Sequence, residues 1–370
     1  MTVLRFFKNN IVMTVALLAA IVTSILVPPD KKYVGYFDFK TLTCLFCVLA
    51  VVCALKNIRF FYILARKIVE AGGNIRTCIL MLVYITFIGS MLIANDMALL
   101  TFLPLGYYVL STTKMEKYME VTFILQNIAA NLGGMLTPFG NPQNLYLYSF
   151  FKINTAEFMG IMAPCFLVAI ILITLCCLIF IKPEKVILQK QRVNLPPIKT
   201  VLYLLLFAFS ILIVFRGIPY WTGLIVIPIF LIFMDKTALK AVDYPLLLTF
   251  VFFFIFAGNM ARIEEVRTAF SYLLSKSTLL FSVVSCQVIS NVPSAVLLSQ
   301  FTENYADLLV GVNIGGAGTL IASLASLITF REYAHHNPNK FKHYIITFSA
   351  FNFGFLAVLT LFALVWNTIF

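Results

Sequence analysis

The pattern N-x-G-G-x-x-T occurs twice in this chain, each time inside an apolar segment. The first copy is Asn131-Leu-Gly-Gly-Met-Leu-Thr137 and the second is Asn313-Ile-Gly-Gly-Ala-Gly-Thr319. Each copy follows another interrupted apolar segment that contains an asparagine, Ala94-Asn95-Asp96 in the first half and Ser290-Asn291-Val292 in the second. Paired breaks in corresponding places are typical of membrane proteins that are built from two internal repeats.

The composition of this chain indicates that much of its surface faces the lipid bilayer rather than water. Hydrophobic residues make up 61% of the chain, charged residues only 11%, and the mean hydropathy is +0.98. A soluble domain has a very different balance. The first apolar run, Ile11 to Val27, lacks a small-residue cleavage site before Pro28, so we predict a retained helix rather than a cleaved signal peptide. The composition predicts an all-α integral membrane protein.

About nine crossings are predicted from the apolar runs that are long enough to span a bilayer. They lie near 10–27, 37–55, 118–149 (broken), 157–181, 199–216, 218–234, 244–258, 306–330 (broken) and 343–366. Residues 77–110 and 277–301 are predicted to be re-entrant hairpins, because each has a polar tip and a second arm that is too short to cross. The stretches 57–72 and 259–276, which contain scattered polar residues, are predicted to lie along the membrane surface.

The distribution of positive charge predicts the orientation. With the N-terminus in the cytoplasm and the C-terminus outside, 19 of the 27 Lys and Arg residues lie in inside loops, as the positive-inside rule requires. The helix at 199–216 adds an odd crossing, so the second unit is inverted relative to the first. We expect a first inverted repeat at 1–181, a basic linker and connecting helix at 182–217, and a second inverted repeat at 218–370. The first hairpin then enters from the cytoplasm and the second from outside.

Several other functions are disfavoured by the same pattern. The net charge is +12, but the basic residues form short clusters between apolar segments, which indicates topology rather than nucleic-acid binding. The eight cysteines lie in apolar stretches and the three histidines share one loop, so we expect no metal site and no cofactor. No G-x-x-x-x-G-K-[ST] loop is present, so ATP is not the expected energy source.

Asp96 is the only carboxylate that the predicted topology places deep within an apolar stretch. A buried carboxylate is costly unless it is neutralised or paired, so Asp96 is a candidate for coupling to a proton or to Na+. The alternative is that Asp96 only caps a helix that starts near Met97. Asn291 has the parallel position in the second half, where capping ahead of Pro293 is again the alternative.

The two N-x-G-G-x-x-T segments are the most specific signal. Paired glycines allow a helix to unwind within the membrane, although they also occur in ordinary helix packing. The stretch from Thr137 to Asn144 adds four polar side chains and two prolines, and irregular backbone at membrane depth is tolerated where it lines a cavity or is buried in protein. Half-helix N-termini can bind an anion without a basic side chain, and unwound carbonyls can bind a cation.

Together with the resemblance of the chain to a known family, these considerations imply two overlapping sets of site residues. For the substrate they are Asn95, Thr137, Gly140, Asn141, Asn144, Asn291, Thr319 and Ser323. For the coupling ion they are Asn95, Asp96, Gly134, Asn291 and Gly316.

With these motifs the chain resembles the ion transporter superfamily, which includes arsenite permeases, citrate permeases and divalent-anion/sodium symporters. The resemblance rests on Ala94-Asn95-Asp96, Gly140-Asn-Pro-Gln-Asn144, Ser290-Asn291 and the Gly-Gly-x-x-Thr segments. It implies that two hairpin tips and two helix breaks form the sites, and it implies a homodimer with an elevator-like movement. The divalent-anion branch has Ser-Asn-Thr at both tips. The Asn-Asp tip of this chain is closer to the arsenite- and citrate-permease side.

We therefore expect a secondary active transporter that moves a small anion, a di- or tricarboxylate, coupled to H+ or Na+. The alternatives within the same fold are an arsenite or metalloid exporter and an Na+/H+ antiporter. An integral membrane enzyme is a third reading, for which Glu264, Glu265 and Arg267 are the candidates. The expected partners are the substrate, the lipid bilayer of a bacterial plasma membrane and a second copy of the chain, without nucleic acid.

Overall fold

The structure is a computed structural model that describes Phe7, residues 10–186 and residues 194–369. Within these residues the regular structure is helical, apart from one isolated antiparallel bridge between Asn74 and Lys185. Residues 1–6 and 8–9 of the expected first repeat, residues 187–193 of the expected linker, and residue 370 lie outside the described residues. The predicted all-α architecture is confirmed.

The first half of the chain contains eight α-helices and three short 3-10 helices within the described residues. In chain order they are α2 (Ile11–Leu26), η1 (Lys31–Tyr36), α3 (Phe39–Asn57), α4 (Phe60–Val69), α5 (Ile75–Ile93), α6 (Asn95–Thr112), η2 (Glu116–Tyr118), α7 (Met119–Gly133), η3 (Gly134–Leu136), α8 (Pro142–Phe150) and α9 (Thr155–Phe180). Side-chain caps set several starts: Asp38 accepts a hydrogen bond from the Thr41 amide at 3.0 Å, and Asn74 accepts one from the Thr77 amide at 3.0 Å.

The second half repeats this order after a connecting helix, α10 (Pro197–Val214). The helices that follow are α11 (Tyr220–Met234), α12 (Lys236–Lys240), α13 (Tyr244–Met260), α14 (Glu264–Lys276), α15 (Thr278–Ile289), α16 (Asn291–Leu298), α17 (Tyr305–Ile314), α18 (Leu324–His336) and α19 (Phe341–Ile369). A helix pair (α5–α6 or α15–α16) precedes a broken segment (α7–α8 or α17–α18) in both halves.

Five helices in the described part of the chain are long and apolar enough to cross a membrane, namely α3, α5, α9, α10 and α19. The pair α13 and α14 is a sixth candidate, and it bends by 97° at its break. Shorter apolar helices include α2, α11, α15 and α17. Large apolar side chains on these helices face outward, as Phe233 does with 84% of its surface exposed. The class of all-α membrane protein is confirmed, and the number of nine crossings stays a prediction.

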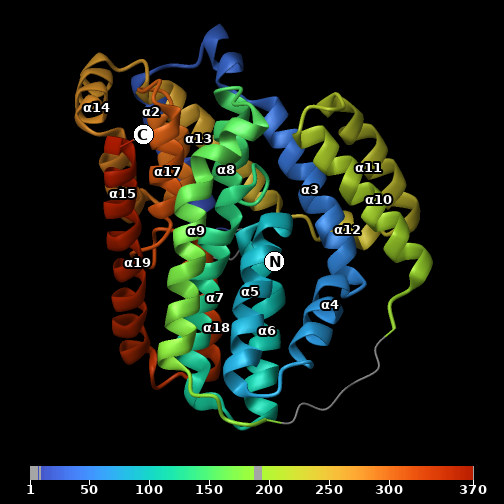
Figure 1. The fold of residues 1–370 in the computed structure, drawn as a ribbon. Helices are drawn as coiled ribbons and strands as arrows, with labels where there is room; N and C mark the ends of the chain where they lie inside the picture. The colour runs from blue at the N-terminus through green and yellow to red at the C-terminus, as the bar shows by residue number, and fades with distance from the viewer. Residues whose placement is uncertain (1–6, 8–9, 187–193, 370) are drawn as a thin grey trace.

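The two halves of the chain interleave. Helix α2 from the first half packs along α13 from the second, while α10 and α11 pack along α3 (Figure 1). Beyond the end of α13, Arg262 donates to both carboxylate oxygens of Asp30, at 2.8 and 3.1 Å, and to the Tyr36 hydroxyl at 3.0 Å. The hydrogen bond from Arg262 lowers the pKa of Asp30 below its ordinary value. This contact ties the loop after α2 to the end of α13.

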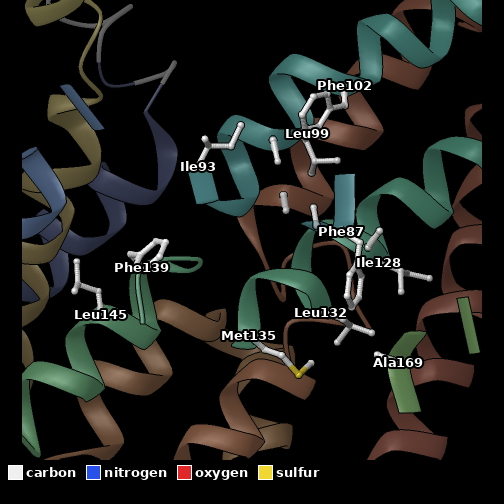
Figure 2. Packing of buried hydrophobic residues seen from close by; sticks show 14 of the residues in the cluster. Phe87, Ile93, Leu99, Phe102, Ile128, Leu132, Met135, Phe139, Leu145 and Ala169 are labelled. Atoms are coloured by element: carbon white, nitrogen blue, oxygen red, sulfur yellow. The ribbon is translucent and has the colours of Figure 1, made fainter. Parts of the chain in front are cut away.

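A second group of helices packs around α7. Helix α5 lies against α6 and α7, α18 lies against α6 and α7, and α9 lies against α7. Figure 2 shows Phe87 of α5 gathered with Ile128 and Leu132 of α7, and all three side chains are at most 2% exposed. The first hairpin and the first broken segment therefore form one packed unit.

The first hairpin differs from the prediction in the length of its second arm. Helix α6 starts at Asn95, directly after a single tip residue, and it has 18 residues. Helix α6 is nevertheless not among the helices that are long and apolar enough to cross a membrane, and α16 has only 8 residues. The re-entrant course of both hairpins therefore stays a prediction. Helices α4 and α14 lie within the two ranges that were predicted for surface helices, and their position in the membrane stays a prediction.

Candidate functional site

The tips of the two hairpins have the same unusual backbone. Ala94 has φ 65° and ψ 151°, and Ser290 has φ 74° and ψ 160°. Residues other than glycine rarely adopt this region, and doing so costs on the order of 1–3 kcal/mol. The next residue is an asparagine in both tips. The Oδ1 atom of Asn95 accepts from the Asp96 amide at 2.9 Å, and that of Asn291 accepts from the Val292 amide at 2.9 Å. Two strained tips of equal geometry support a common design for both halves.

Asp96 does not cap a helix. Its backbone lies in the first turn of α6, Ala94 occupies the cap position, and no side-chain capping hydrogen bond is formed there. The Oδ1 atom of Asp96 is buried and has no hydrogen-bond partner. The alternative of Asp96 as a cap is therefore wrong, because the helix begins two residues earlier than the sequence suggested. The corresponding residue of the second tip is Val292, so only one tip carries a charge.

The threonine of each motif forms a hydrogen bond from the helix break to the first arm of the neighbouring hairpin. The Thr137 hydroxyl donates to the Met91 carbonyl at 2.7 Å, and the Thr319 hydroxyl donates to the Gln287 carbonyl at 3.2 Å. Met91 lies four residues before Asn95, and Gln287 lies four residues before Asn291. The same contact is therefore made at the same place in both halves.

The glycines of the first motif permit close backbone contacts. A Cβ atom on Gly133 would lie 2.1 Å from the Phe87 carbonyl oxygen, and one on Gly134 would lie 2.4 Å from Oδ1 of Asn141. In the second motif, a Cβ atom on Gly316 would lie 3.2 Å from Nδ2 of Asn291. Gly133 is therefore needed for the approach of α7 to α5, and Gly134 is needed for the fold of the break itself.

We expect Gly133→Ala to lower the stability of the protein by about 1–3 kcal/mol, because the Phe87 carbonyl belongs to a rigid helix and cannot move aside. The matched control is Gly160→Ala in α9, where an added Cβ meets no atom within 4 Å. Alanine at that helical position should leave stability unchanged or raise it. Thermal unfolding of the two detergent-solubilised variants measures the difference, and equal unfolding temperatures would contradict the packing argument.

Buried amide side chains stabilise the non-helical backbone of both breaks. In the first break, Nδ2 of Asn144 donates to the carbonyls of Gly134, Met135 and Thr137 at 3.1–3.3 Å. In the second break, Nε2 of Gln287 donates to the carbonyls of Gly315 and Ala317, and its Oε1 accepts from the Thr319 amide at 2.9 Å. These bonds satisfy backbone groups that a continuous helix would have paired internally.

Asparagines of the two motifs connect the halves. Asn131 accepts from Nδ2 of Asn95 at 3.1 Å and donates to the Ser323 hydroxyl at 3.1 Å. Asn313 accepts from Nδ2 of Asn141 at 3.2 Å and donates to Oδ1 of Asn144 at 2.6 Å. All of these side chains are at most 4% exposed. The breaks therefore meet at a shared network of buried amides.

A small cavity, which we call the tip chamber, lies where the two hairpin tips meet. Its volume is about 40 Å³. The polar lining comes from both tips, from the first break and from α13, and consists of Asn95, Asp96, Gln143, Thr249, Ser290 and Asn291. The apolar lining consists of Val12, Pro142, Leu246, Phe253, Val292, Pro293 and Leu324. No basic side chain is among these lining residues.

The predicted site residues divide into two groups. Asn95, Asp96 and Asn291 line the tip chamber directly. The others do not line it but make contacts within and around the breaks, and they are Thr137, Gly140, Asn141, Asn144, Thr319, Ser323, Gly134 and Gly316.

Sequence reasoning missed Gln143, Gln287 and the first motif residues Asn131 and Asn313 as parts of the site. Each is a polar side chain in an apolar context, and that signal could have identified them. Gln143 is 1% exposed, and its Oε1 atom has no hydrogen-bond partner while its Nε2 donates to Asn313 at 3.4 Å. Oδ1 of Asn141 is also buried without a partner. Oxygen atoms of this kind can accept from a protonated ligand or coordinate a hard cation.

A second cavity, the side cavity, is also lined by Asp96. Its volume is about 70 Å³, and it shares Asp96, Pro142, Leu246 and Leu324 with the tip chamber. Asp243, which caps α13 by accepting from the Leu246 amide at 3.0 Å, also lines it. Two carboxylates therefore border one apolar cavity, and no group of three or more His, Cys, Asp or Glu residues suited to a metal was found in the described residues.

An all-α membrane fold with two paired helix breaks that meet at one buried polar chamber has the architecture of a secondary transporter. The family model described as citrate transporter matches residues 5–309 of this chain. An uncharacterized transporter of Methanocaldococcus jannaschii is 33% identical over 298 residues, which cover 80% of this chain and 81% of the relative. The inner membrane protein YbiR of Escherichia coli K12 is 28% identical over 342 residues, which cover 88% and 87%.

The chain belongs to the citrate transporter family, and it is an integral membrane transporter. The resemblance to the ion transporter superfamily is confirmed. The residues that an enzyme would have used, Glu264, Glu265 and Arg267, lie on α14 and do not line the tip chamber.

Proposed function

We propose that this protein moves a small anion, a di- or tricarboxylate, across the plasma membrane in obligatory coupling with H+ or Na+. Citrate is the first substrate to test, because the matching family model carries that description. The observation that carries the proposal is the tip chamber, where the strained tips of both hairpins meet beside the only carboxylate of either tip.

Charge supports the coupling. Asp96 and an anionic substrate would lie in the same chamber, whose lining contains no Lys, Arg or His. Two negative charges a few ångströms apart repel strongly where the dielectric constant is low. A cation must therefore enter with the substrate, either as a proton on Asp96 or as Na+ beside it. The amide groups of Asn95 and Asn291 supply neutral hydrogen-bond donors to the substrate.

The construction of the chamber supports an elevator-like movement. One wall comes from the hairpin tips and the first break, while Val12 of α2 and Leu246, Thr249 and Phe253 of α13 form the opposite wall. Helices α2 and α13 form one packed pair and the first hairpin and first break form another packed group, although α13 also contacts α16 of the second hairpin. A chamber of about 40 Å³ holds on the order of one water molecule. The substrate must therefore separate the walls when it binds, and a movement of one group along the other would carry it across.

The assembly and the coupling ion are parts of the same proposal. The family resemblance supports a homodimer, and the distribution of Lys and Arg supports a cytoplasmic N-terminus and a C-terminus outside. Na+ would be bound by oxygen atoms, for which the free Oδ1 of Asp96 and Oε1 of Gln143 are available. The bilayer and the anionic substrate are the proposed partners.

Uptake by purified protein in liposomes tests this function. We expect labelled citrate or succinate to accumulate when either an inward proton gradient or an inward Na+ gradient is imposed, and accumulation to stop when an ionophore collapses that gradient. Uptake of chloride, a small anion, and of arsenite, an oxyacid, is measured for comparison. An absence of gradient-driven uptake of every carboxylate tested would overturn the proposal.

Exchange of Na+ for H+ is a second candidate, favoured by the side cavity alone. Asp96 and Asp243 border this cavity from different helices, and paired carboxylates can bind a cation or share a proton. Release of trapped protons on addition of Na+, without any organic anion present, would support the antiporter. Proton release that requires a carboxylate substrate would support the symporter.

A further inference from the structure

A third cavity lies between the α3–α4 corner and α6, and we call it the basic cavity. Its volume is about 260 Å³, the space of several water molecules. One wall is formed by the end of α3 and the start of α4, and the other by the middle of α6. The lining residues are Lys56, Arg59, Phe61, Tyr62, Leu100, Thr101 and Pro104.

Leu100 joins the basic cavity to the site. It lines the basic cavity on one side and the side cavity, which contains Asp96, on the other. The side cavity in turn shares Asp96 and Pro142 with the tip chamber. The three cavities therefore form a series, and the Leu100 side chain separates the first from the second.

The sequence of α6 places this series along one face of the helix. Asp96, Leu100 and Pro104 are spaced four residues apart, so their side chains follow one another at intervals of one turn. Pro104 has no amide hydrogen, so it supplies no helical hydrogen bond to the carbonyl of Leu100. The helix is therefore less constrained at Leu100 than elsewhere, which favours a small movement of this residue.

The charge of the basic cavity suits an anion. Lys56 and Arg59 both line it, and no carboxylate is among the lining residues. Both basic side chains are exposed, and neither forms an ion pair with any residue that the structure describes. A cavity lined by one sign of charge raises the local concentration of ions of the opposite sign.

We propose that the basic cavity is the aqueous entrance to the site from the membrane face that carries Lys56 and Arg59, and that Leu100 is its gate. The entrance gathers a carboxylate substrate on Lys56 and Arg59 and passes it to Asp96 and the tip chamber when Leu100 moves. This inference rests on the proposed function for the identity of the ion, but not for the existence of a water-filled path.

Thiol labelling tests the path without any knowledge of the substrate. The positive-charge count predicts that Lys56 and Arg59 lie on the cytoplasmic face. We therefore expect Leu100→Cys in the full-length protein to react with a membrane-impermeant methanethiosulfonate in vesicles that expose the cytoplasmic face, and not in vesicles of the opposite orientation. Leu99→Cys is the matched control, because Leu99 is 0% exposed whereas Leu100 is 46% exposed. The unsubstituted protein provides the baseline, since seven of its eight cysteines are buried and Cys176 is half-buried.

The charge of the reagent tests the role of the two basic residues. Adding Lys56→Gln and Arg59→Gln to the Leu100→Cys variant should slow labelling by an anionic sulfonate reagent at least about threefold and speed labelling by a cationic ammonium reagent. Added salt should reduce both effects. Equal labelling rates with and without the two substitutions would contradict the proposal that this cavity concentrates anions.

The outcomes separate the entrance from the function. No labelling of Leu100→Cys would show that lipid fills the cavity, and labelling from the outer face would place the entrance on the wrong side; either result overturns the inference. Labelling of Leu100→Cys that blocks uptake of citrate or succinate supports both the gate and the transport proposal. Sided, charge-dependent labelling in a protein that moves no carboxylate would retain the entrance and reject the proposed substrate.

Discussion

Replacing Asp96 with asparagine is expected to lower gradient-driven uptake at least about tenfold, equivalent to about 1.4 kcal/mol. Asparagine keeps the size of the side chain but can neither bind a proton nor carry a negative charge. The need for a co-transported cation then disappears, because the chamber no longer contains a charge that repels the substrate. Exchange of external for internal substrate, which needs no net movement of cations, should persist.

The measurement compares gradient-driven uptake with exchange in liposomes that contain equal amounts of each protein. Glu265→Gln is the matched control, since it removes one exposed carboxylate from α14 without touching the chamber. The control should retain both activities. Normal gradient-driven uptake by Asp96→Asn would remove Asp96 from the coupling mechanism, and equal loss of uptake and exchange would assign it to substrate binding instead.

The second large effect is a loss of stability, which we expect when Asn144 but not its neighbour Gln143 is replaced by alanine. Asn144→Ala leaves three backbone carbonyls of the first break without their donor and removes the acceptor of Asn313. An unsatisfied buried polar group costs about 1–3 kcal/mol, so this variant should lose several kcal/mol of stability and accumulate poorly in the membrane. Its predicted role as a substrate contact would then be secondary to its structural role.

Gln143→Ala should behave differently, although Gln143 is equally buried. Its Oε1 atom has no hydrogen-bond partner among the described residues, and the hydrogen bond from its Nε2 atom to Asn313 is 3.4 Å long. Stability should fall by no more than about 1 kcal/mol. The thermal stabilisation that a transported carboxylate or Na+ provides should shrink, since at a fixed ligand concentration a weaker ligand stabilises the folded state less. Equal unfolding temperatures for Asn144→Ala and Gln143→Ala would contradict this division of roles.

The two hairpin tips have matching backbone conformations but differ in one side chain. Ala94 and Ser290 adopt nearly the same backbone angles, and each is followed by an asparagine that accepts from the next amide. The next side chain is Asp96 in one tip and Val292 in the other. The proposed coupling to a cation therefore depends on a single tip, while the hydrogen-bonding amides are available in both.

The order of elements could be predicted from the sequence because each depends on local features. The apolar runs, the paired glycines and the prolines determine where helices form and stop. The ranges expected for the broken segments, 118–149 and 306–330, accordingly contain the breaks after Gly133 and Ile314. The second arm of the first hairpin was underestimated, because the helix continues through Asn95 and Asp96, which resemble capping residues.

The functions of individual polar residues depended on the tertiary structure. Asn95, Asp96 and Asn291 can be recognised in the sequence because they interrupt apolar segments, and these three line the tip chamber. Only the fold decided that Asn144 and Gln287 hold the breaks, that Gln143 faces the chamber and that Asp243 approaches Asp96. The hydrogen-bond partners of a buried amide come from segments as much as 236 residues away along the chain, and composition and spacing carry no record of which segments will meet.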